Sequence, residues 1–195
     1  MTMVKMKKII SASKKGVSSY QLSEEKSGMP DVPVINMRAV QDGYIDPKNV
    51  DLVKIDQKFI RDVTKIKSGD LIITCRGTTL KAAVADEFVN DFVLSNNLMA
   101  FTLSTEVKPE IIAAYLNGPV GQRELNKMAG GTNMLTLNLK GLEQVLVPLI
   151  PASEQDKIVQ FIKEAKEYKA CLVKELELWE ELVDSYLVDK WGDMQ

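Results

Sequence analysis

Apolar side chains recur in alternating steps of three and four residues along the C-terminal part of the chain. The stripe consists of Ile158, Ile162, Ala165, Leu172, Leu176, Trp179, Val183 and Tyr186. Lys169 interrupts it once, and the spacing is that of a heptad seam held for about four heptads. Ser153 and Asp156 form a capping-box pattern, and no Pro or Gly follows before Gly192. The pattern therefore predicts one helix from Ser153 to about Lys190, roughly 55 Å long.

Two interpretations of this helix are open. An amphipathic helix can lie on its own domain, which is the ordinary use of an apolar stripe. A seam this long and narrow is instead typical of a helix that pairs with a second helix. Because a domain of some 150 residues has a radius of gyration of roughly 15 Å, a helix of this length would extend beyond it. We favour a paired spacer helix, with residues 151–195 forming the spacer and dimerisation region.

The preceding residues 1–150 alternate between strand-like and helical patterns. Strands are expected at 32–38, 69–75, 82–88, 92–103, 135–139 and 145–150, and helices at 57–62, 110–117 and up to about 129. The segments 16–27 and 130–133 have loop composition, and Asp42-Gly43 is a turn signal. The expected fold class is α+β: a β-rich domain, antiparallel or mixed, with short helices, followed by one long coiled-coil helix.

Composition fits an intracellular protein with a charge gradient. The chain is 45% hydrophobic and 27% charged, and its two cysteines suggest no disulfide framework. Neither a signal peptide nor an apolar run of membrane-spanning length is recognisable, so a cytoplasmic location is expected. Residues 1–85 hold 15 Lys/Arg and 9 Asp/Glu, whereas residues 151–195 hold 6 and 11. A basic front and an acidic tail indicate that the front meets a polyanion.

The chain lacks the residues that most catalytic mechanisms require. The chain has no histidine, which excludes histidine-based triads and imidazole acid–base catalysis. Walker and Gly-x-Gly-x-x-Gly loops and the Asn-Pro-Pro-aromatic tetrapeptide of amino-methyltransferases are also absent. Pro30-Asp31 followed by Asp56-Gln57-Lys58 can be aligned with the carboxylate-and-lysine signature of PD-(D/E)xK-like metal-dependent nucleases. That motif is short enough to arise by chance. We therefore interpret the chain as non-catalytic, without a cofactor or metal of its own.

Three stretches, in order, resemble the specificity subunit of type I restriction–modification systems. The first is residues 34–38 with Asp42-Gly43, and the second is residues 69–74 with Arg76-Gly77. The third and most specific starts at Gly130-Gly131-Thr132, continues through 147–151 and ends at Glu154-Gln155. Together they cover nearly the whole chain. Members of the family commonly carry two target-recognition domains and two helices, whereas this chain has one of each and resembles a half-subunit.

The resemblance implies a division of labour. Residues 1–150 would be a target-recognition domain that reads one half of a split DNA sequence through the major groove. The long helices would pair antiparallel, set the distance between half-sites and dock the modification subunits. Those methyltransferase partners bind S-adenosylmethionine, so this chain would need no cofactor. Expected partners are double-stranded DNA, the modification subunits and a second copy of the chain.

The candidate DNA contacts are basic or small polar residues at predicted turns and strand ends. They are Lys14, Lys15, Arg38, Arg76, Thr78, Thr79, Lys81, Asn96, Asn97, Gly130, Gly131, Thr132 and Asn133. Some of them also have a plainer interpretation: a tight turn at Gly130-Gly131, a surface strand residue at Arg38 and a turn at Asn96-Asn97. An alternative of a different class is a coiled-coil adaptor or inhibitor that binds protein instead of DNA.

Overall fold

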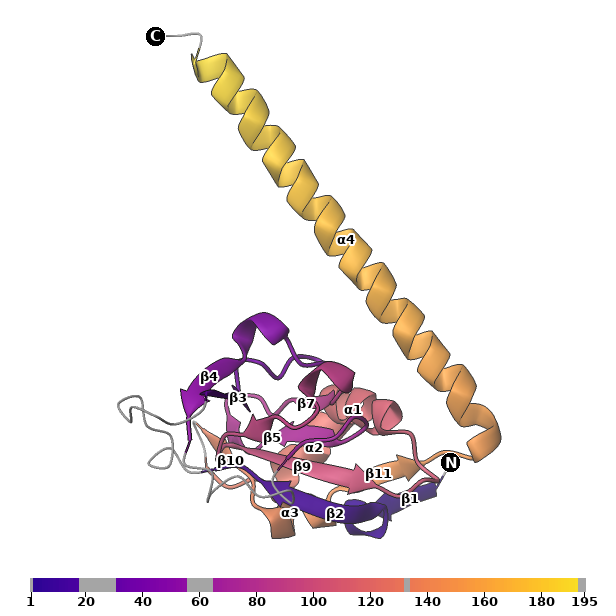
Figure 1. Cartoon of the computed structure of the whole chain (residues 1–195). Coiled ribbons are helices and arrows are strands. Elements are labelled where there is room, and N and C mark those ends of the chain that lie inside the picture. Colours follow the sequence, from indigo (N-terminus) through magenta and orange to yellow (C-terminus); the bar gives the residue numbers. More distant parts are fainter. Residues whose placement is uncertain (1, 18–30, 56–64, 132–133, 193–195) are drawn as a thin grey trace. The chain divides into compact units, whose positions relative to one another are not determined.

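The computed structural model describes residues 2–17, 31–55, 65–131 and 134–192. The chain divides into two compact units, residues 1–155 and residues 156–195. The first unit combines short helices with sheets, and the second continues one long helix (Figure 1). The α+β class predicted from the sequence is confirmed. The predicted helix at 57–62 lies outside the described residues.

A four-stranded antiparallel sheet forms the centre of the first unit, with the strand order β2-β9-β5-β7. Its strands are β2 (Ile10–Lys15), β9 (Leu98–Leu103), β5 (Leu71–Thr74) and β7 (Ala82–Val84). All four residues of β5 are buried, because successive side chains point to opposite faces and both faces are covered. Leu71 and Ile73 pack into one apolar cluster and Ile72 into another. A continuous apolar run is the expected sequence of such a strand.

One face of this sheet is covered by helices. These are α1 (Pro109–Asn117), α2 (Pro119–Met128) and α3 (Leu139–Gln144), whose buried residues share a cluster with Phe101. Pro109 and Pro119 occupy first-turn positions, where the missing N–H needs no partner. The helix boundaries predicted from Pro109 and Gly118-Pro119 are confirmed. Asn138 caps α3 by accepting a hydrogen bond from Gly141 N over 2.9 Å.

The other face packs against buried loop residues, among them Val40 and Ile66, and against Ile35 and Leu94 of a three-stranded sheet with the order β4-β3-β8. Its strands are β3 (Asp31–Ile35), β4 (Asp51–Lys54) and β8 (Val93–Leu94), and β3 pairs antiparallel with β4 and parallel with β8. The strand predicted through Arg38 ends at Ile35. Asn36 turns the chain, because its Oδ1 accepts the backbone N–H groups of Arg38 and Ala39.

Three other predicted strands are shorter than their sequence patterns. The strand predicted at 135–139 ends at Thr136, and α3 begins at Leu139. The strand predicted at 82–88 stops at Val84, and 3-10 helix η6 (Glu87–Val89) follows. The strand predicted at 92–103 is divided into β8 and β9 by a turn at Asn96-Asn97. A further 3-10 helix, η3 (Pro47–Asn49), precedes β4 and is capped by the Asp46 side chain.

The N-terminal residues form strands that no sequence pattern indicated. β1 (Thr2–Lys5) pairs antiparallel with β11 (Leu146–Leu149), and the 3-10 helix η1 (Met6–Lys8) leads into β2. β1 and β11 lie side by side in Figure 1 although they are far apart in the sequence. Pairing between segments so far apart in the sequence leaves no local signature. The basic N-terminal residues therefore gave no sign of a strand.

The long helix α4 runs uninterrupted over Ala152–Gly192. It begins one residue before Ser153, so this serine lies in the first turn and the prediction that it caps the helix is wrong. The first turn is fixed to the first unit by Gln155, which is 4% exposed. Its Nε2 donates to the carbonyl oxygens of Glu106 and Ile150 over 2.7 and 2.9 Å, and its Oε1 accepts from Lys108 N over 2.8 Å.

Candidate nucleic-acid interface

Several candidate residues meet at one end of the four-stranded sheet. In the strand register Lys15 lies opposite Met99, Thr74 opposite Leu98, and Ile73 opposite Ala82. The C-terminal ends of β2 and β5 therefore share an edge with the N-terminal ends of β9 and β7. This places Lys15 and the segments 76–81 and 96–97 together, although they come from three parts of the sequence.

A small ribbon extends from the same end. In β6 (Arg76–Gly77), Arg76 pairs with Thr136 and Gly77 with Leu135 of β10 (Leu135–Thr136). Thr136 in turn exchanges two backbone hydrogen bonds of 2.9 and 2.8 Å with Gly130. We call the surface formed by Lys15, Arg38 and residues 76–81, 96–97, 130–131 and 134–136 the ribbon end.

Cys75 joins the ribbon to the sheet through its backbone. Its N–H donates to Asn97 O over 2.7 Å, and its carbonyl oxygen accepts from Leu137 N over 2.9 Å. Burial raises the pKa of the Cys75 thiol to about 12, so the side chain stays neutral and unreactive at physiological pH. Cys75 thus supports the ribbon and contributes no nucleophile or metal ligand.

Glycine is required at the turn beside the ribbon. Gly131 has φ +95°, and a Cβ there would lie 2.2 Å from the carbonyl oxygen of Met134. This satisfies the plainer interpretation of Gly130-Gly131 as a tight turn. The neighbouring candidates Thr132 and Asn133 lie outside the described residues. Any approach of this backbone to a phosphate remains a prediction.

The cations of the ribbon end differ in how they are held. Arg76, Thr78 and Thr79 are exposed. Lys81 Nζ donates to Gln41 Oε1 over 3.1 Å, and Gln41 Nε2 donates to Arg38 O over 2.6 Å, which holds the 36–41 turn beside the 76–81 segment. Arg38 itself is 71% exposed and pairs with Asp51 over 2.9 Å. Asp51 therefore partly neutralises Arg38, whereas Lys15 is exposed at the end of β2.

Lys14 points to the interior instead. Its side chain is 9% exposed, and its Nζ lies 2.5 Å from Oδ2 of Asp70, which is 2% exposed. Asp70 also accepts hydrogen bonds from Thr102 Oγ1 over 2.6 Å and from Lys67 N over 2.9 Å. A buried charge is tolerated when it is paired and hydrogen-bonded in this way. Because its ammonium is engaged by Asp70, we leave Lys14 out of the ribbon end.

The structure adds residues to the ribbon end that the sequence did not single out. Thr136 belongs to it through its pairing with Arg76, Met134 is 59% exposed beside Gly131, and Gln41 adjoins it through its hydrogen bonds to Lys81 and Arg38. Only Thr136 had a local signal, as an exposed position in an alternating segment. Gln41 and Met134 had none, because their position depends on pairing with distant segments.

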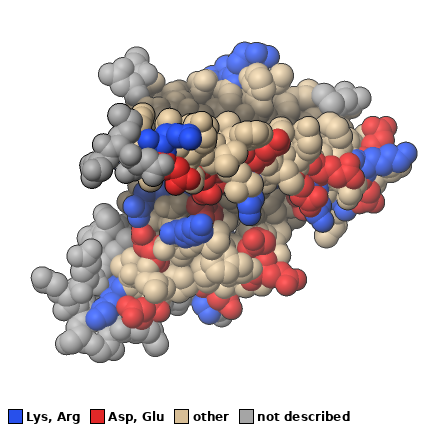
Figure 2. Space-filling model, turned by 90° about the horizontal axis from the view of Figure 1, so that it is seen from above, with Lys and Arg blue, Asp and Glu red and all other residues tan. Residues whose placement is uncertain are grey.

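Basic and acidic side chains are interspersed on the face of the molecule shown in Figure 2. At the ribbon end the charge comes from Lys15, Arg38, Arg76 and Lys81, four side chains on separate turns or strand ends. Such separated cations can contact successive phosphates, while Thr and Asn side chains between them can reach base edges.

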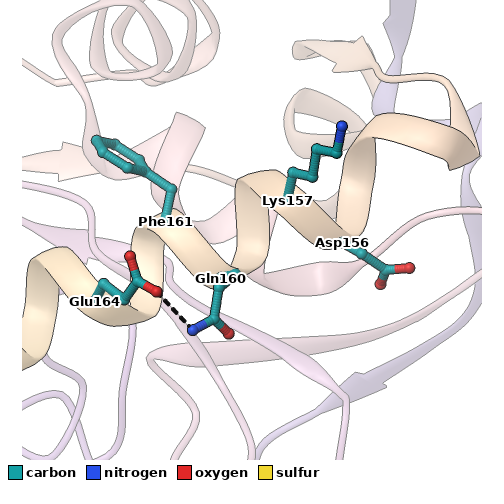
Figure 3. A pocket seen from close by; sticks show the side chains of 5 residues that line it. All are labelled: Asp156, Lys157, Gln160, Phe161 and Glu164. Carbon is teal, nitrogen blue, oxygen red and sulfur yellow. Dashed lines mark hydrogen bonds between the residues drawn. The ribbon is translucent and has the colours of Figure 1, made fainter.

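The predicted seam is a surface stripe of α4. Ile158 and Ile162 are half-buried and Ala165 is exposed, whereas Leu172, Leu176, Trp179, Val183 and Tyr186 are 47–61% exposed. A shallow hollow near the start of the second unit is lined by Asp156, Lys157, Gln160, Phe161 and Glu164 of this helix (Figure 3). Phe161 projects away from the Gln160–Glu164 hydrogen bond.

Within the described part of the chain, no group of three or more His, Cys, Asp or Glu side chains is placed to hold a metal ion. Of the nuclease-like pattern only Asp31, an exposed residue at the start of β3, is described. Pro30 and residues 56–58 lie outside the described residues. No helix in the described ranges is both long enough and apolar enough to cross a bilayer.

Comparisons with known proteins agree with the resemblance found in the sequence. The family model of the type I restriction–modification DNA specificity domain matches residues 1–177. A curated relative is the specificity subunit of the type I restriction enzyme EcoBI from Escherichia coli. It is 25% identical over 150 residues, which are 74% of this chain and 31% of the relative.

Solved structures of specificity subunits share the fold. The HsdS subunit from Thermoanaerobacter tengcongensis has a TM-score of 0.58 and 18% identity, covering 88% of this chain and 38% of that one. The type I S subunit from M. genitalium has a TM-score of 0.56 and 16% identity, covering 95% and 44%. The chain thus spans less than half the length of these relatives. Because the family model covers most of its residues, including the first unit and much of α4, the chain belongs to the family of type I restriction–modification DNA specificity domains.

Proposed function

We propose that this chain is the sequence-reading component of a type I modification complex and catalyses no reaction itself. The first unit reads one half of a split DNA target through the ribbon end. The long helices of two copies pair, set the distance between the two readers and dock the methyltransferase subunits. Those subunits supply S-adenosylmethionine and the methyl transfer. The observation that carries the proposal is the family match over residues 1–177, which spans both the domain and the helix.

The ribbon end supports the reading role. It presents four cations from three separate segments together with exposed Thr78 and Thr79. Loops and strand ends on a rigid sheet are suited to recognition, because the buried strands fix the positions of exposed side chains. A ribbon as narrow as β6–β10 also has dimensions that a DNA major groove admits.

A dimer with twofold symmetry should read a symmetric target. Two identical readers related by a twofold axis contact two identical half-sites in opposite orientation, so the site should be an inverted repeat with an uncontacted spacer. Methylome sequencing of cells that co-express this chain and the methyltransferase subunit would reveal the site. Cells with the methyltransferase subunit alone are the control. An asymmetric site from a complex in which this is the sole specificity chain would overturn the symmetric arrangement.

Binding to duplex DNA should depend steeply on salt, and the ribbon end should set the slope. Replacing Lys15, Arg76 or Lys81 singly with Gln should reduce the slope of log K against log salt by about one unit each. Each replacement removes one phosphate contact, so binding releases about one counterion fewer from the DNA. Fluorescence anisotropy with a random-sequence duplex measures this. Lys8→Gln is the matched control, since Lys8 is exposed in η1, before the opposite end of β2.

The same titration separates the adaptor alternative. A coiled-coil adaptor that binds protein would show a weak slope that all four substitutions leave unchanged. Unchanged slopes for the three ribbon-end variants, combined with salt-steep binding by the wild-type chain, would instead mean that the DNA surface lies elsewhere on the first unit.

A further inference from the structure

The flanking residues of the α4 seam define how a second copy would lie on it. The seam residues fall on two heptad positions, with Ile158, Leu172 and Trp179 on one and Ile162 and Leu176 on the other. We call these positions d and a. In an antiparallel pair, each d residue packs against an a residue of the partner helix, and residues at position e face position e of the partner.

The residues at the e positions of one helix are complementary to those of a second copy that runs in the opposite direction. In chain order they are Val159, Lys166, Val173, Glu180 and Leu187. When two copies run antiparallel with Val173 opposite Val173 of the second copy, Lys166 faces Glu180, and Val159 faces Leu187. Every contact along this edge then joins opposite charges or two apolar side chains, and each occurs twice by symmetry except the central one.

The seam agrees with the same alignment. Leu172 packs against Leu176 of the second copy, and small Ala165 lies opposite Val183. Lys169, the one polar interruption, lies opposite Trp179, where an ammonium group and an indole ring make a favourable cation–π contact. On the remaining flank Tyr168 meets Leu182, and the one like-charge contact is Glu175 against its own copy.

Other alignments lose these matches. A parallel pair would place Lys169 against Lys169 in the seam and Glu175 against Glu180 beside it. An antiparallel pair shifted by one heptad in either direction would place both Lys166 and Glu180 opposite apolar residues. Lys166, Val173 and Glu180 are exposed in the described structure and available to a partner, whereas Val159 and Leu187 are half-buried.

We propose that two copies of this chain pair antiparallel through α4 with Val173 at the twofold axis, and that the Lys166–Glu180 pairs fix this alignment. The proposal rests on the dimer of the proposed function and specifies its geometry. Oppositely charged flanking residues are the usual determinant of partner orientation in coiled coils.

A charge exchange tests the alignment. Lys166→Glu and Glu180→Lys should each weaken the dimer by about tenfold at low salt, because each creates two like-charge contacts. The double exchange Lys166→Glu/Glu180→Lys should return the dissociation constant to within about twofold of the wild-type value. Sedimentation equilibrium measures all three. Lys174→Glu and Glu177→Lys, which make the same charge changes on the outer face of the helix, should leave the dissociation constant unchanged.

Crosslinking provides a second readout in a Cys171→Ser background, which removes the exposed native thiol. Val173→Cys should crosslink to itself with a short bis-maleimide, whereas Leu187→Cys, at the far end from its own copy, should not. A double exchange as weak as the single variants, or equal crosslinking at the two sites, would overturn the alignment. A wild-type chain that stays monomeric would instead overturn the proposed dimer.

Discussion

Replacing Leu172 and Leu176 with Asp is expected to convert the dimer into a monomer. Both side chains lie in the middle of the seam, and they are 47% and 61% exposed in the single chain. Pairing would bury two Leu residues from each copy, each contributing about 1.5–3 kcal/mol when fully buried. The substituted dimer would lose this contribution and hold four carboxylates together without partners. We expect the dissociation constant to rise by at least about a thousandfold, the equivalent of several kcal/mol.

Light scattering at tens of micromolar protein measures the effect directly. Circular dichroism should be recorded alongside, because a long isolated helix depends on packing for much of its stability and α4 is expected to lose some helix content. Leu178→Asp/Val188→Asp is the matched control. These residues are 55% and 67% exposed and lie outside the seam, so the same chemical change should leave the dimer intact. A dimer that survives the Leu172/Leu176 double substitution would place the interface elsewhere.

Deleting residues 169–175 is expected to shorten the spacer of the DNA target without changing the half-sites. Removing seven residues keeps the seam in phase, and the flanking pair Lys166–Glu180 is retained in the antiparallel alignment. At 1.5 Å per residue the two readers approach by about 10 Å along the helix axis. This corresponds to a spacer shorter by up to about three base pairs at 3.4 Å each.

Methylome sequencing with the deleted chain and the unchanged methyltransferase subunit gives the result. Deleting residues 169–173 is the informative control, because five residues turn the C-terminal half of the seam about 140° away from the N-terminal half. Charged residues such as Lys174 and Glu177 then take seam positions, and modification should be abolished. A changed half-site after the seven-residue deletion would mean that α4 takes part in base reading. An unchanged spacer would mean that α4 does not set the distance between the readers.

Local sequence patterns determined the elements whose signal lies within one segment. The long helix was predicted at Ser153 to about Lys190 and is observed at Ala152–Gly192. A heptad pattern sustained over this length without Pro or Gly can form little else. The strand at Leu71–Thr74 followed from a continuous apolar run, and the break between α1 and α2 followed from Gly118-Pro119. The motifs that carry the family resemblance could also be identified from the sequence alone.

Tertiary structure alone decided which residues share a surface. β1 pairs with β11, and Arg76 pairs with Thr136, across separations that leave no trace in local periodicity. Lys14 and Lys15 are adjacent and look alike in the sequence, yet one is paired with Asp70 inside and the other is exposed, because successive strand residues point to opposite faces. Periodicity specifies how a segment folds, whereas the neighbours of each side chain depend on long-range pairing that only the folded chain establishes.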